Sequence, residues 1–226
     1  MHFPELTISR RSLLGGVALA AIATALPFAF TPGIAQAQEL PESTGDVDMA
    51  AVMKPGPLPE AALGDANAPV KIVEYMSMTC PHCANFHNKT FEEIKKKYID
   101  TGKVYFVLRE FPFDPRAAAA FMLARCAPEG QYFPFVSMLF KQQQSWATAQ
   151  DARAALLQMS KMAGFSQESF EACLTNQKLL DDVNATMQRG ATEFGVNSTP
   201  TFIINGKKYA GDMSVETMSA VIDKLL

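Results

Sequence analysis

The chain has 226 residues, of which 48% are hydrophobic and 19% are charged, and its net charge is −3. This length suits one large domain or two small ones, and the composition supports a packed globular core. Without a basic excess there is no electrostatic footprint for nucleic acid, so nucleic acid is excluded as an expected partner.

The first 37 residues predict a cleaved export signal. A basic start at Arg10 and Arg11 precedes an uncharged, largely apolar run over 13–30, and small residues then mark a cleavage site after Ala37. An uncleaved membrane anchor is the alternative, because a run of this length is at the border of a membrane span. The glycines and the proline within the run favour cleavage.

Two export routes remain open. The sequence around Ser9, Arg10 and Arg11, followed by two leucines, resembles a twin-arginine signal, but an ordinary secretory signal also begins with basic residues. Either route ends outside the cytoplasm, in an oxidising compartment where disulfides persist.

Residues 38–68 are rich in Pro, Gly, Ala and acidic residues, which predicts an extended arm with little helix. A buried strand is expected over 69–76, with Glu74 on the same face as three apolar residues. From Cys80 the apolar spacing becomes helical up to a stop at Thr101 and Gly102, and a second strand follows over 103–110.

Residues 114–194 read as helical throughout, in three or four helices. Asp114 is the expected N-cap of the first, with proline in its first turn. Gly164 is a C-cap candidate, Ser166 caps the next helix, and Gly195 ends the last one.

The chain then returns to strand over 202–204 and 207–209. The Asn205-Gly206 pair between these runs predicts a tight hairpin, because both turn residues need positive φ. A final helix is expected from Ser214 to Leu226.

The stretch "SMTCPHCANFH" holds two of the four cysteines, Cys80 and Cys83, where the first strand turns into the first helix. A c-type haem site is excluded because Ala84, not histidine, follows the second cysteine. A zinc site would need His82 and His87 as further ligands at crowded spacing. A structural bond across two residues would constrain the unfolded chain little. A redox-active dithiol therefore fits best.

The expected chemistry depends on the helix N-terminus. A thiolate there faces unpaired N–H donors and the positive end of the helix dipole, Pro81 fits the first turn, and His82 adds a nearby donor. Together these can lower a cysteine pKa from about 8.5 to about 3.5–7.5, which makes the disulfide a stronger oxidant. Cys80 is the expected attacked sulfur and Cys83 the buried resolving sulfur.

These motifs resemble the DsbA-like periplasmic disulfide oxidoreductases. The resemblance rests on "EYMSMTCPHC" and "NSTPTFIINGKKYAG" and covers about Pro69 to Leu226. It implies an α/β thioredoxin fold with an inserted all-helical domain. The expected organisation is a signal over 1–37, an arm over 38–68, a thioredoxin-like domain over 69–113 and 195–226, and a helical insertion over 114–194.

The resemblance also assigns roles to three residues. It implies that Pro200 is cis and lies beside Cys80, so that the turn exposes backbone groups of Thr199 for pairing with a substrate strand. Glu74 falls where the family keeps a buried acid, which would shuttle a proton for Cys83. The alternative for Glu74 is a surface carboxylate at a strand end. His87 is expected on the helix surface or at the core edge.

Cys126 and Cys173 both lie in the helical insertion. They could form a structural disulfide across 47 residues of chain, or remain buried free thiols. Similar pairs occur in some relatives, which favours the disulfide.

The expected function is that of a periplasmic thiol oxidase, which donates its Cys80–Cys83 disulfide to exported proteins through a mixed disulfide at Cys80. The resemblance implies reoxidation by a quinone-linked membrane partner, with no dissociable cofactor and no metal. A disulfide isomerase or reductase of the same fold is the first alternative, and a metal-binding module is the second.

Overall fold

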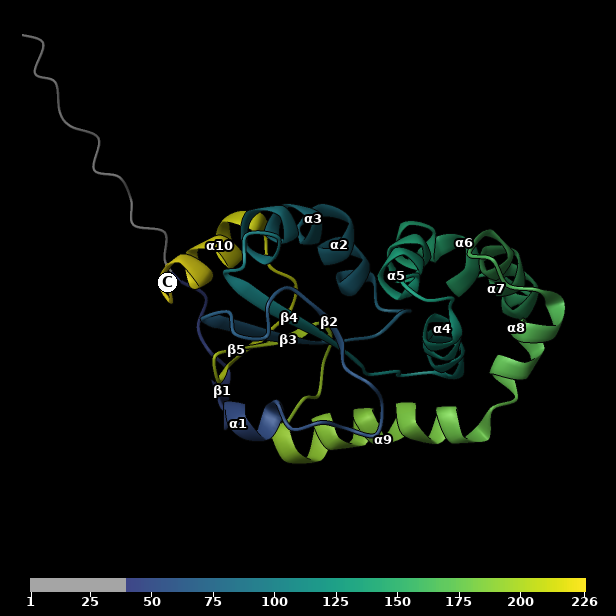
Figure 1. Ribbon diagram of the computed structural model, residues 1–226, viewed down its shortest axis with the longest axis horizontal. Coiled ribbons are helices and arrows are strands. Elements are labelled where there is room, and N and C mark those ends of the chain that lie inside the picture. Colours follow the sequence, from purple (N-terminus) through teal and green to yellow (C-terminus); the bar gives the residue numbers. More distant parts are fainter. Residues whose placement is uncertain (1–39) are drawn as a thin grey trace, which may run out of the picture. The chain divides into compact units, whose positions relative to one another are not determined.

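A six-stranded mixed sheet lies at the centre of residues 40–226, the part of the chain that this computed structural model describes (Figure 1). The expected export signal falls outside these residues. In spatial order the strands are β1 (Gly45–Asp46), β6 (Lys207–Ala210), β5 (Thr201–Ile204), β3 (Val70–Met76), β4 (Val104–Glu110) and β2 (Ala61–Leu63). β3 and β4 are parallel and the other neighbouring pairs are antiparallel. The sheet and its helices form the expected thioredoxin fold.

Helices cover both faces of this sheet and form a bundle beside it (Figure 1). In chain order they are α1 (Met49–Val52), α2 (Pro81–Lys89), α3 (Phe91–Ile94), the π-helical turn η1 (Lys95–Ile99), α4 (Pro115–Cys126), α5 (Tyr132–Lys141), α6 (Gln143–Ala147), α7 (Ala152–Met162), α8 (Gln167–Leu174), α9 (Gln177–Phe194) and α10 (Val215–Asp223). α2, α3 and α10 lie over one face, α1 and α9 lie over the other, and α4 to α8 make up the helical insertion.

Side-chain alternation along β3 divides the core between the two faces. Val70, Ile72 and Met76 pack into the larger apolar cluster, which continues into α2, α3, α10 and the insertion. Val73 and Tyr75 pack into a smaller cluster on the α1 and α9 side. All five are fully buried, as expected for a central strand covered on both faces.

Several expected helix ends and turns are formed by local hydrogen bonds. The carboxylate of Asp114 accepts from the backbone N–H groups of the first turn of α4, and the hydroxyls of Ser166 and Ser214 cap α8 and α10. Asn205 and Gly206 both have positive φ, 44° and 91°, in the tight turn between β5 and β6. In each case the capping or turn residue lies within a few residues of the backbone that it bonds or shapes.

The helix expected after Cys80 is interrupted. α2 ends at Lys89, Thr90 has φ −114°, and the chain continues through α3 into the π turn that ends at Ile99. The hydroxyl of buried Thr90 donates to the carbonyl oxygen of Met213, 2.8 Å away. This tertiary bond is formed at the break, where α2 gives way to α3.

The segment over 38–68 is more than the extended arm that its composition predicts. Within its described residues, β1 pairs with β6 and β2 pairs with β4, so the segment supplies both edge strands of the sheet. α1 lies between them and buries Val52. The two strands are only two and three residues long, too short to show a period of two, so their edge pairing leaves no sequence pattern.

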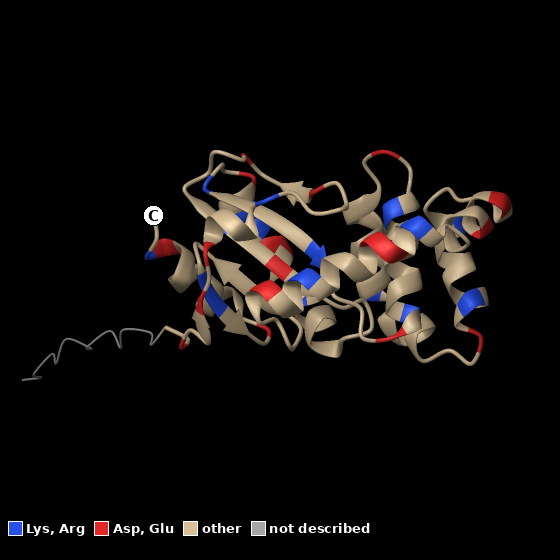
Figure 2. Ribbon diagram, turned by 90° about the horizontal axis from the view of Figure 1, so that it is seen from below, with Lys and Arg blue, Asp and Glu red and all other residues tan. Residues whose placement is uncertain are grey.

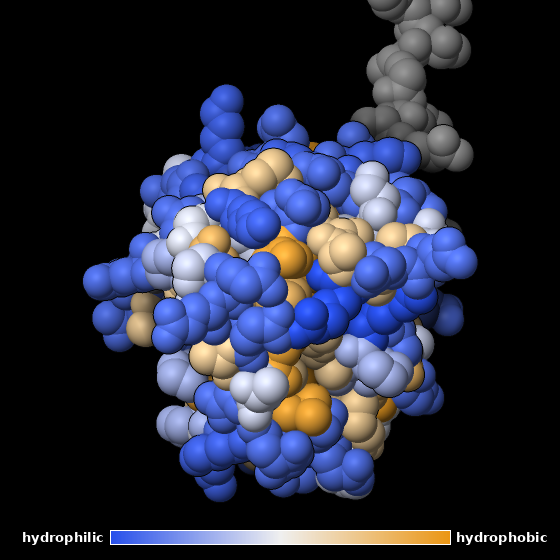
Figure 3. All heavy atoms as spheres, turned by 90° about the vertical axis from the view of Figure 1, so that its right-hand side faces the viewer, coloured by the Kyte–Doolittle hydropathy of each residue, from blue (hydrophilic) through white to orange (hydrophobic). Residues whose placement is uncertain are grey.

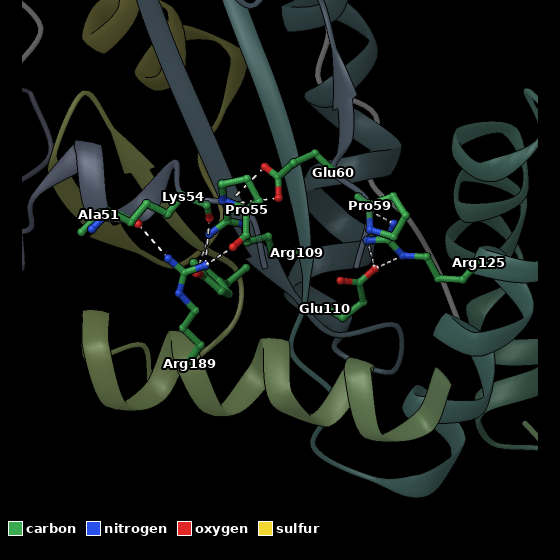
Figure 4. Close-up of polar contacts among 10 residues, drawn as sticks. Ala51, Lys54, Pro55, Pro59, Glu60, Arg109, Glu110, Arg125 and Arg189 are labelled. Atoms are coloured by element: carbon green, nitrogen blue, oxygen red, sulfur yellow. Dashed lines mark hydrogen bonds and ion pairs between the residues drawn. The ribbon is translucent and has the colours of Figure 1, made fainter. Parts of the chain in front are cut away.

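Three arginines fasten this segment to the rest of the fold (Figure 4). Arg189 on α9 donates to the carbonyl oxygens of Ala51, Lys54 and Pro55. Buried Arg109 on β4 pairs with Glu60, and Arg125 on α4 bonds both Glu110 and the carbonyl oxygen of Pro59. The arginine side chains thus supply hydrogen-bond donors to carbonyl oxygens between β1 and β2 that have no partner strand.

α9 belongs to both parts of the fold. Its N-terminal half packs Leu180 and Val183 into the cluster shared with the insertion, and its C-terminal half packs Ala191 and Phe194 beneath the sheet. An αL cap at Gly195 then ends the helix and returns the chain to β5. The helix thus physically links the insertion to the sheet.

Charges on the described surface are mixed. Acidic and basic residues are interspersed over both sheet and helices in Figure 2, and the insertion end in Figure 3 is mainly hydrophilic with small apolar patches. Over residues 40–226, the helices are too short or too polar for any of them to span a membrane.

Candidate active site

Cys80 lies at the junction between the central strand and the helix that covers it. It is the N-cap of α2, with extended backbone angles, and Pro81 occupies the first helical position. The N–H of Cys80 donates to the carbonyl of Ser77, and its own carbonyl accepts from Ala84. The sulfur is therefore held where the N–H groups of the first helical turn have no helical acceptors.

The two sulfurs are in different surroundings. Both cysteines are free thiols here; Cys80 is partly exposed and Cys83, one turn into the helix, is completely buried. A substrate sulfur approaching from solvent can therefore reach Cys80 and not Cys83.

The surroundings of Cys80 favour its thiolate. The pKa of Cys80 is lowered to about 5, and the hydrogen bond to the neighbouring Cys83 thiol is the largest cause. The side chain of Thr199 and the backbone N–H groups of Cys83 and His82 contribute to this lowering, and partial burial opposes it. At neutral pH the exposed sulfur is thus an anion.

The surroundings of Cys83 have the opposite effect. Burial is the main reason that its pKa lies well above the usual value, and its hydrogen bond to Cys80 and the negative charge of Glu74 raise it further. Cys83 therefore stays protonated while Cys80 is ionised. The pair holds a single proton at neutral pH, and it is on the inner sulfur.

The Thr199–Pro200 peptide bond is cis, and its loop lies against Cys80. The Cys80 thiol donates to the carbonyl oxygen of Thr199 across 3.2 Å. Thr199 is 93% buried, and its carbonyl oxygen accepts the hydrogen bond from the Cys80 thiol; pairing of its backbone with a substrate strand stays a prediction. In this thiol state the Thr199 hydroxyl has no hydrogen-bond partner among the described residues, which leaves it available to a thiolate.

The imidazole of His82 differs from the expected thiolate donor. Its side chain is 69% exposed, and Nδ1 lies 3.6 Å from a carboxylate oxygen of Asp212. What residue 82 contributes to Cys80 is its backbone N–H. No sequence pattern pairs His82 with an acid 130 residues away.

Glu74 is fully buried on β3, and His87 is its partner. Oε2 of Glu74 lies 2.9 Å from Nε2 of His87, while Oε1 is buried with no partner in the described part of the chain. His87 was expected at the helix surface or core edge, but it is 94% buried. It follows Cys83 by four residues, so both lie on the face of α2 that meets Glu74.

Two residues of the insertion hold the loop before Cys80. Buried Gln143 on α6 donates its amide to the carbonyl oxygens of Met78 and Cys80, each 2.9 Å away. Asp114, besides capping α4, accepts from the hydroxyl of Thr79 at 2.6 Å. Sequence reasoning found Asp114 only as a cap and missed Gln143, because three consecutive glutamines offer no sign of which one is buried.

Cys126 at the end of α4 and Cys173 on α8 form a disulfide 47 residues apart in sequence. The bond joins two helices of the insertion. Across residues 40–226 no cluster of three or more His, Cys, Asp or Glu side chains has an arrangement that could hold a metal ion.

The sequence is also similar to those of known proteins. The family described as Thioredoxin matches residues 58–224. A Rickettsia felis protein, named as a candidate protein-disulfide oxidoreductase, is 34% identical over 168 residues, which cover 74% of this chain and 60% of that protein. The chain thus spans about 60% of the length of the curated relatives it matches.

Solved structures show the same arrangement of elements. The crystal structure of Wolbachia pipientis alpha-DsbA1 is 33% identical, with a TM-score of 0.71, and the match covers 77% of this chain and 94% of that one. Oxidised BdbD from Bacillus subtilis, at 20% identity, has a TM-score of 0.66, covers 83% of this chain and 98% of its own, and shares the fold.

Proposed function

Because the chain belongs to the thioredoxin family, among its DsbA-like members, we propose that it is a protein thiol–disulfide oxidoreductase that acts as an oxidase. In this proposal the disulfide between Cys80 and Cys83 is donated to cysteine pairs of exported proteins. No dissociable cofactor takes part, since the two electrons are carried by the sulfurs themselves.

The reaction proceeds by two thiolate attacks. A substrate thiolate attacks the Cys80 sulfur of the oxidised protein, a mixed disulfide forms, and Cys83 leaves with the electron pair and takes up a proton. A second substrate thiolate attacks the substrate sulfur of the mixed disulfide and releases Cys80 as a thiolate. The substrate gains a disulfide, and the protein is left with two reduced cysteines.

One observation carries the proposal: the pKa of the accessible sulfur, Cys80, is lowered to about 5 while that of buried Cys83 is raised. A stabilised Cys80 thiolate favours the reduced protein, which makes its disulfide a good electron acceptor. It also makes Cys80 the better leaving group in the second attack. Pro81, Pro200 and the Thr199 hydroxyl are proposed to hold this sulfur in place, and Glu74 to exchange protons with Cys83.

The proposed location is the periplasm, after cleavage of the N-terminal signal. The basic, apolar and small-residue regions of residues 1–37 support it, as does a mechanism that needs an oxidising compartment. Reoxidation is assigned to a quinone-linked membrane partner. In that step the exposed Cys80 thiolate would attack a disulfide of the partner, and buried Cys83 would then attack Cys80, which restores the Cys80–Cys83 disulfide and releases the partner's sulfur.

The test uses a reduced peptide with two cysteines and the oxidised protein in equal amounts. We expect one peptide disulfide per protein, and none from Cys80→Ser or Cys83→Ser, because neither variant can form the disulfide. When reduced Cys83→Ser is given the peptide in its disulfide form, the Cys80 thiolate should attack it and trap a mixed disulfide at residue 80. A protein that leaves the peptide reduced would contradict the proposal. An isomerase would instead reactivate a scrambled substrate faster than it oxidises a reduced one, and metal analysis of the purified protein tests the metal-binding alternative.

A further inference from the structure

The carboxyl group of Glu74 has a single hydrogen-bond partner among the described residues, and it is close enough to Cys83 to raise the pKa of that thiol. Its backbone pairs with Leu108 on β4 and Phe202 on β5, which are both fully buried and apolar. His87 contacts one carboxyl oxygen at 2.9 Å, and the other oxygen has no partner. A buried acid in such surroundings can exchange a proton with solvent only through a group that also reaches solvent.

His87 is such a group. Its ring stacks on Phe140, with 4.5 Å between ring centroids and 18° between planes, and Phe91 lies on its α3 side. His87 also lines a groove of about 660 Å³ between α3 and α5, and 4% of its side chain is exposed. The charged groups around this groove are Glu92 and Lys95, from α3 and η1, and Lys141 at the end of α5. The imidazole thus lies between the buried carboxyl and an open groove.

The disulfide chemistry creates a need for this path. When a thiolate attacks Cys80, the sulfur of Cys83 leaves as an anion inside the core, where burial strongly disfavours a charge. It needs a proton as the S–S bond breaks, and it must lose that proton again when the disulfide is remade. Glu74 lies beside it, but it holds at most one proton and is sealed from solvent.

We propose that His87 is a proton-relay and positioning residue, which connects the groove between α3 and α5 to Glu74 and through it to Cys83. This deepens the proposed function and rests on it. In the reducing direction, a proton passes from water in the groove to the imidazole, from Nε2 to the Glu74 carboxylate, and from the carboxyl to the Cys83 thiolate. In the oxidising direction it returns by the same route, so the reaction leaves no additional charge in the core.

The experiment measures reduction of the oxidised protein by dithiothreitol in rapid-quench samples between pH 5 and pH 8, with free thiols trapped by alkylation. His87→Asn keeps an N–H donor near Glu74, but its amide neither gains nor loses a proton between pH 5 and pH 8 and so cannot relay one, and His87→Ala opens a site for added imidazole. Glu92→Gln, an exposed groove residue, is the control. Titration of the Cys80 thiolate, with a pKa of about 5, checks that each variant is folded around the site.

We expect dithiothreitol to reduce the disulfide of H87N about tenfold more slowly than that of the wild type at pH 7. This effect is smaller than the hundredfold or more that a directly acting general acid contributes. The reduction rate of H87N should vary less with pH than that of the wild type. Added imidazole should restore the rate of H87A, up to a plateau at high imidazole concentration. E92Q should match the wild type. Should H87N not fold, H87A and His87→Gln carry the same test.

A wild-type rate and pH profile in H87N or in its substitute H87Q would overturn the relay, and so would a slow H87A that imidazole does not restore. Dithiothreitol reacts with any exposed protein disulfide, so this result does not depend on natural substrates. Failure of the oxidase proposal would appear separately, as a wild-type protein that reacts with dithiothreitol but does not oxidise the peptide.

Discussion

Gln143 of the helical insertion donates its side-chain amide to the carbonyl oxygen of Cys80 across 2.9 Å. A residue outside the sheet thus fixes the backbone at the reactive sulfur. The same amide donates to the carbonyl oxygen of Met78; that bond is buried, and the bond to Cys80 is partly buried. The insertion is therefore a structural support for the loop that carries Cys80, besides covering one side of it.

Replacing Gln143 by alanine should loosen this loop. The variant leaves the Met78 carbonyl oxygen without its donor, and we expect the free energy of unfolding to fall by about 1–3 kcal/mol. The alkylation rate of Cys80 should change with it. Urea unfolding and iodoacetamide kinetics measure both, and Gln144→Ala, at the exposed neighbouring position, is the control. Equal behaviour of the two variants would show that the amide does not support the loop.

Thr199→Val should raise the pKa of Cys80 above about 5. The hydroxyl that can donate to the thiolate is lost, while the shape of the side chain is kept. At low pH, where Cys80 is a thiol and the hydroxyl is unpartnered, the substitution should cost little stability. Thiolate absorbance near 240 nm follows the titration, and Thr199→Ser should stay close to the wild type. An unchanged midpoint in T199V would exclude a role for the hydroxyl.

The stability of the reduced protein should depend on pH in a direction set by Cys80. Its folded pKa of about 5 lies below the unfolded value of 9.0, so its contribution is fully present above pH 9 and is lost as pH falls through 5. The oxidised protein has no such proton to titrate. Unfolding free energies of the two forms between pH 4 and 9 should therefore converge toward acid. Parallel curves, or convergence toward alkali, would contradict the assigned thiolate.

The disulfide between Cys126 and Cys173 should stabilise the fold and leave the redox reaction unchanged. Loop entropy for 47 residues gives at most about 4 kcal/mol, which the double serine variant should lose in part. Neither cysteine has a second thiol at redox spacing, so peptide oxidation per folded protein should equal that of the wild type. A variant that folds fully but oxidises poorly would link this bond to the chemistry.

The sequence predicted what local chemistry decides. Asp114, Ser166 and Ser214 cap helices through hydrogen bonds to residues three or fewer positions away, and the Asn205-Gly206 turn needs only its own backbone angles. The reactive centre could be predicted from the spacing of Cys80 and Cys83 at a helix N-terminus, whereas the thioredoxin fold was an expectation from the resemblance of two motifs to a known family.

Long-range contacts left no such signal. The edge strand β1 pairs Gly45 with Lys208, and β2 is equally short, so neither shows a period. The pairing of Glu74 with His87 depends on how α2 lies over β3, which spacing alone does not fix. A buried carboxyl group nevertheless needs a hydrogen-bond partner. That requirement could have identified His87 as a candidate partner of Glu74.

The reduction potential of the Cys80–Cys83 couple tests the central claim most directly. The protein would be equilibrated with glutathione buffers of known ratio, and the fraction of reduced cysteines measured after alkylation. A stabilised Cys80 thiolate predicts a potential above about −180 mV, toward the value of about −120 mV for a strong oxidant. A potential near about −270 mV would contradict the account, because such a couple would reduce protein disulfides instead of supplying them.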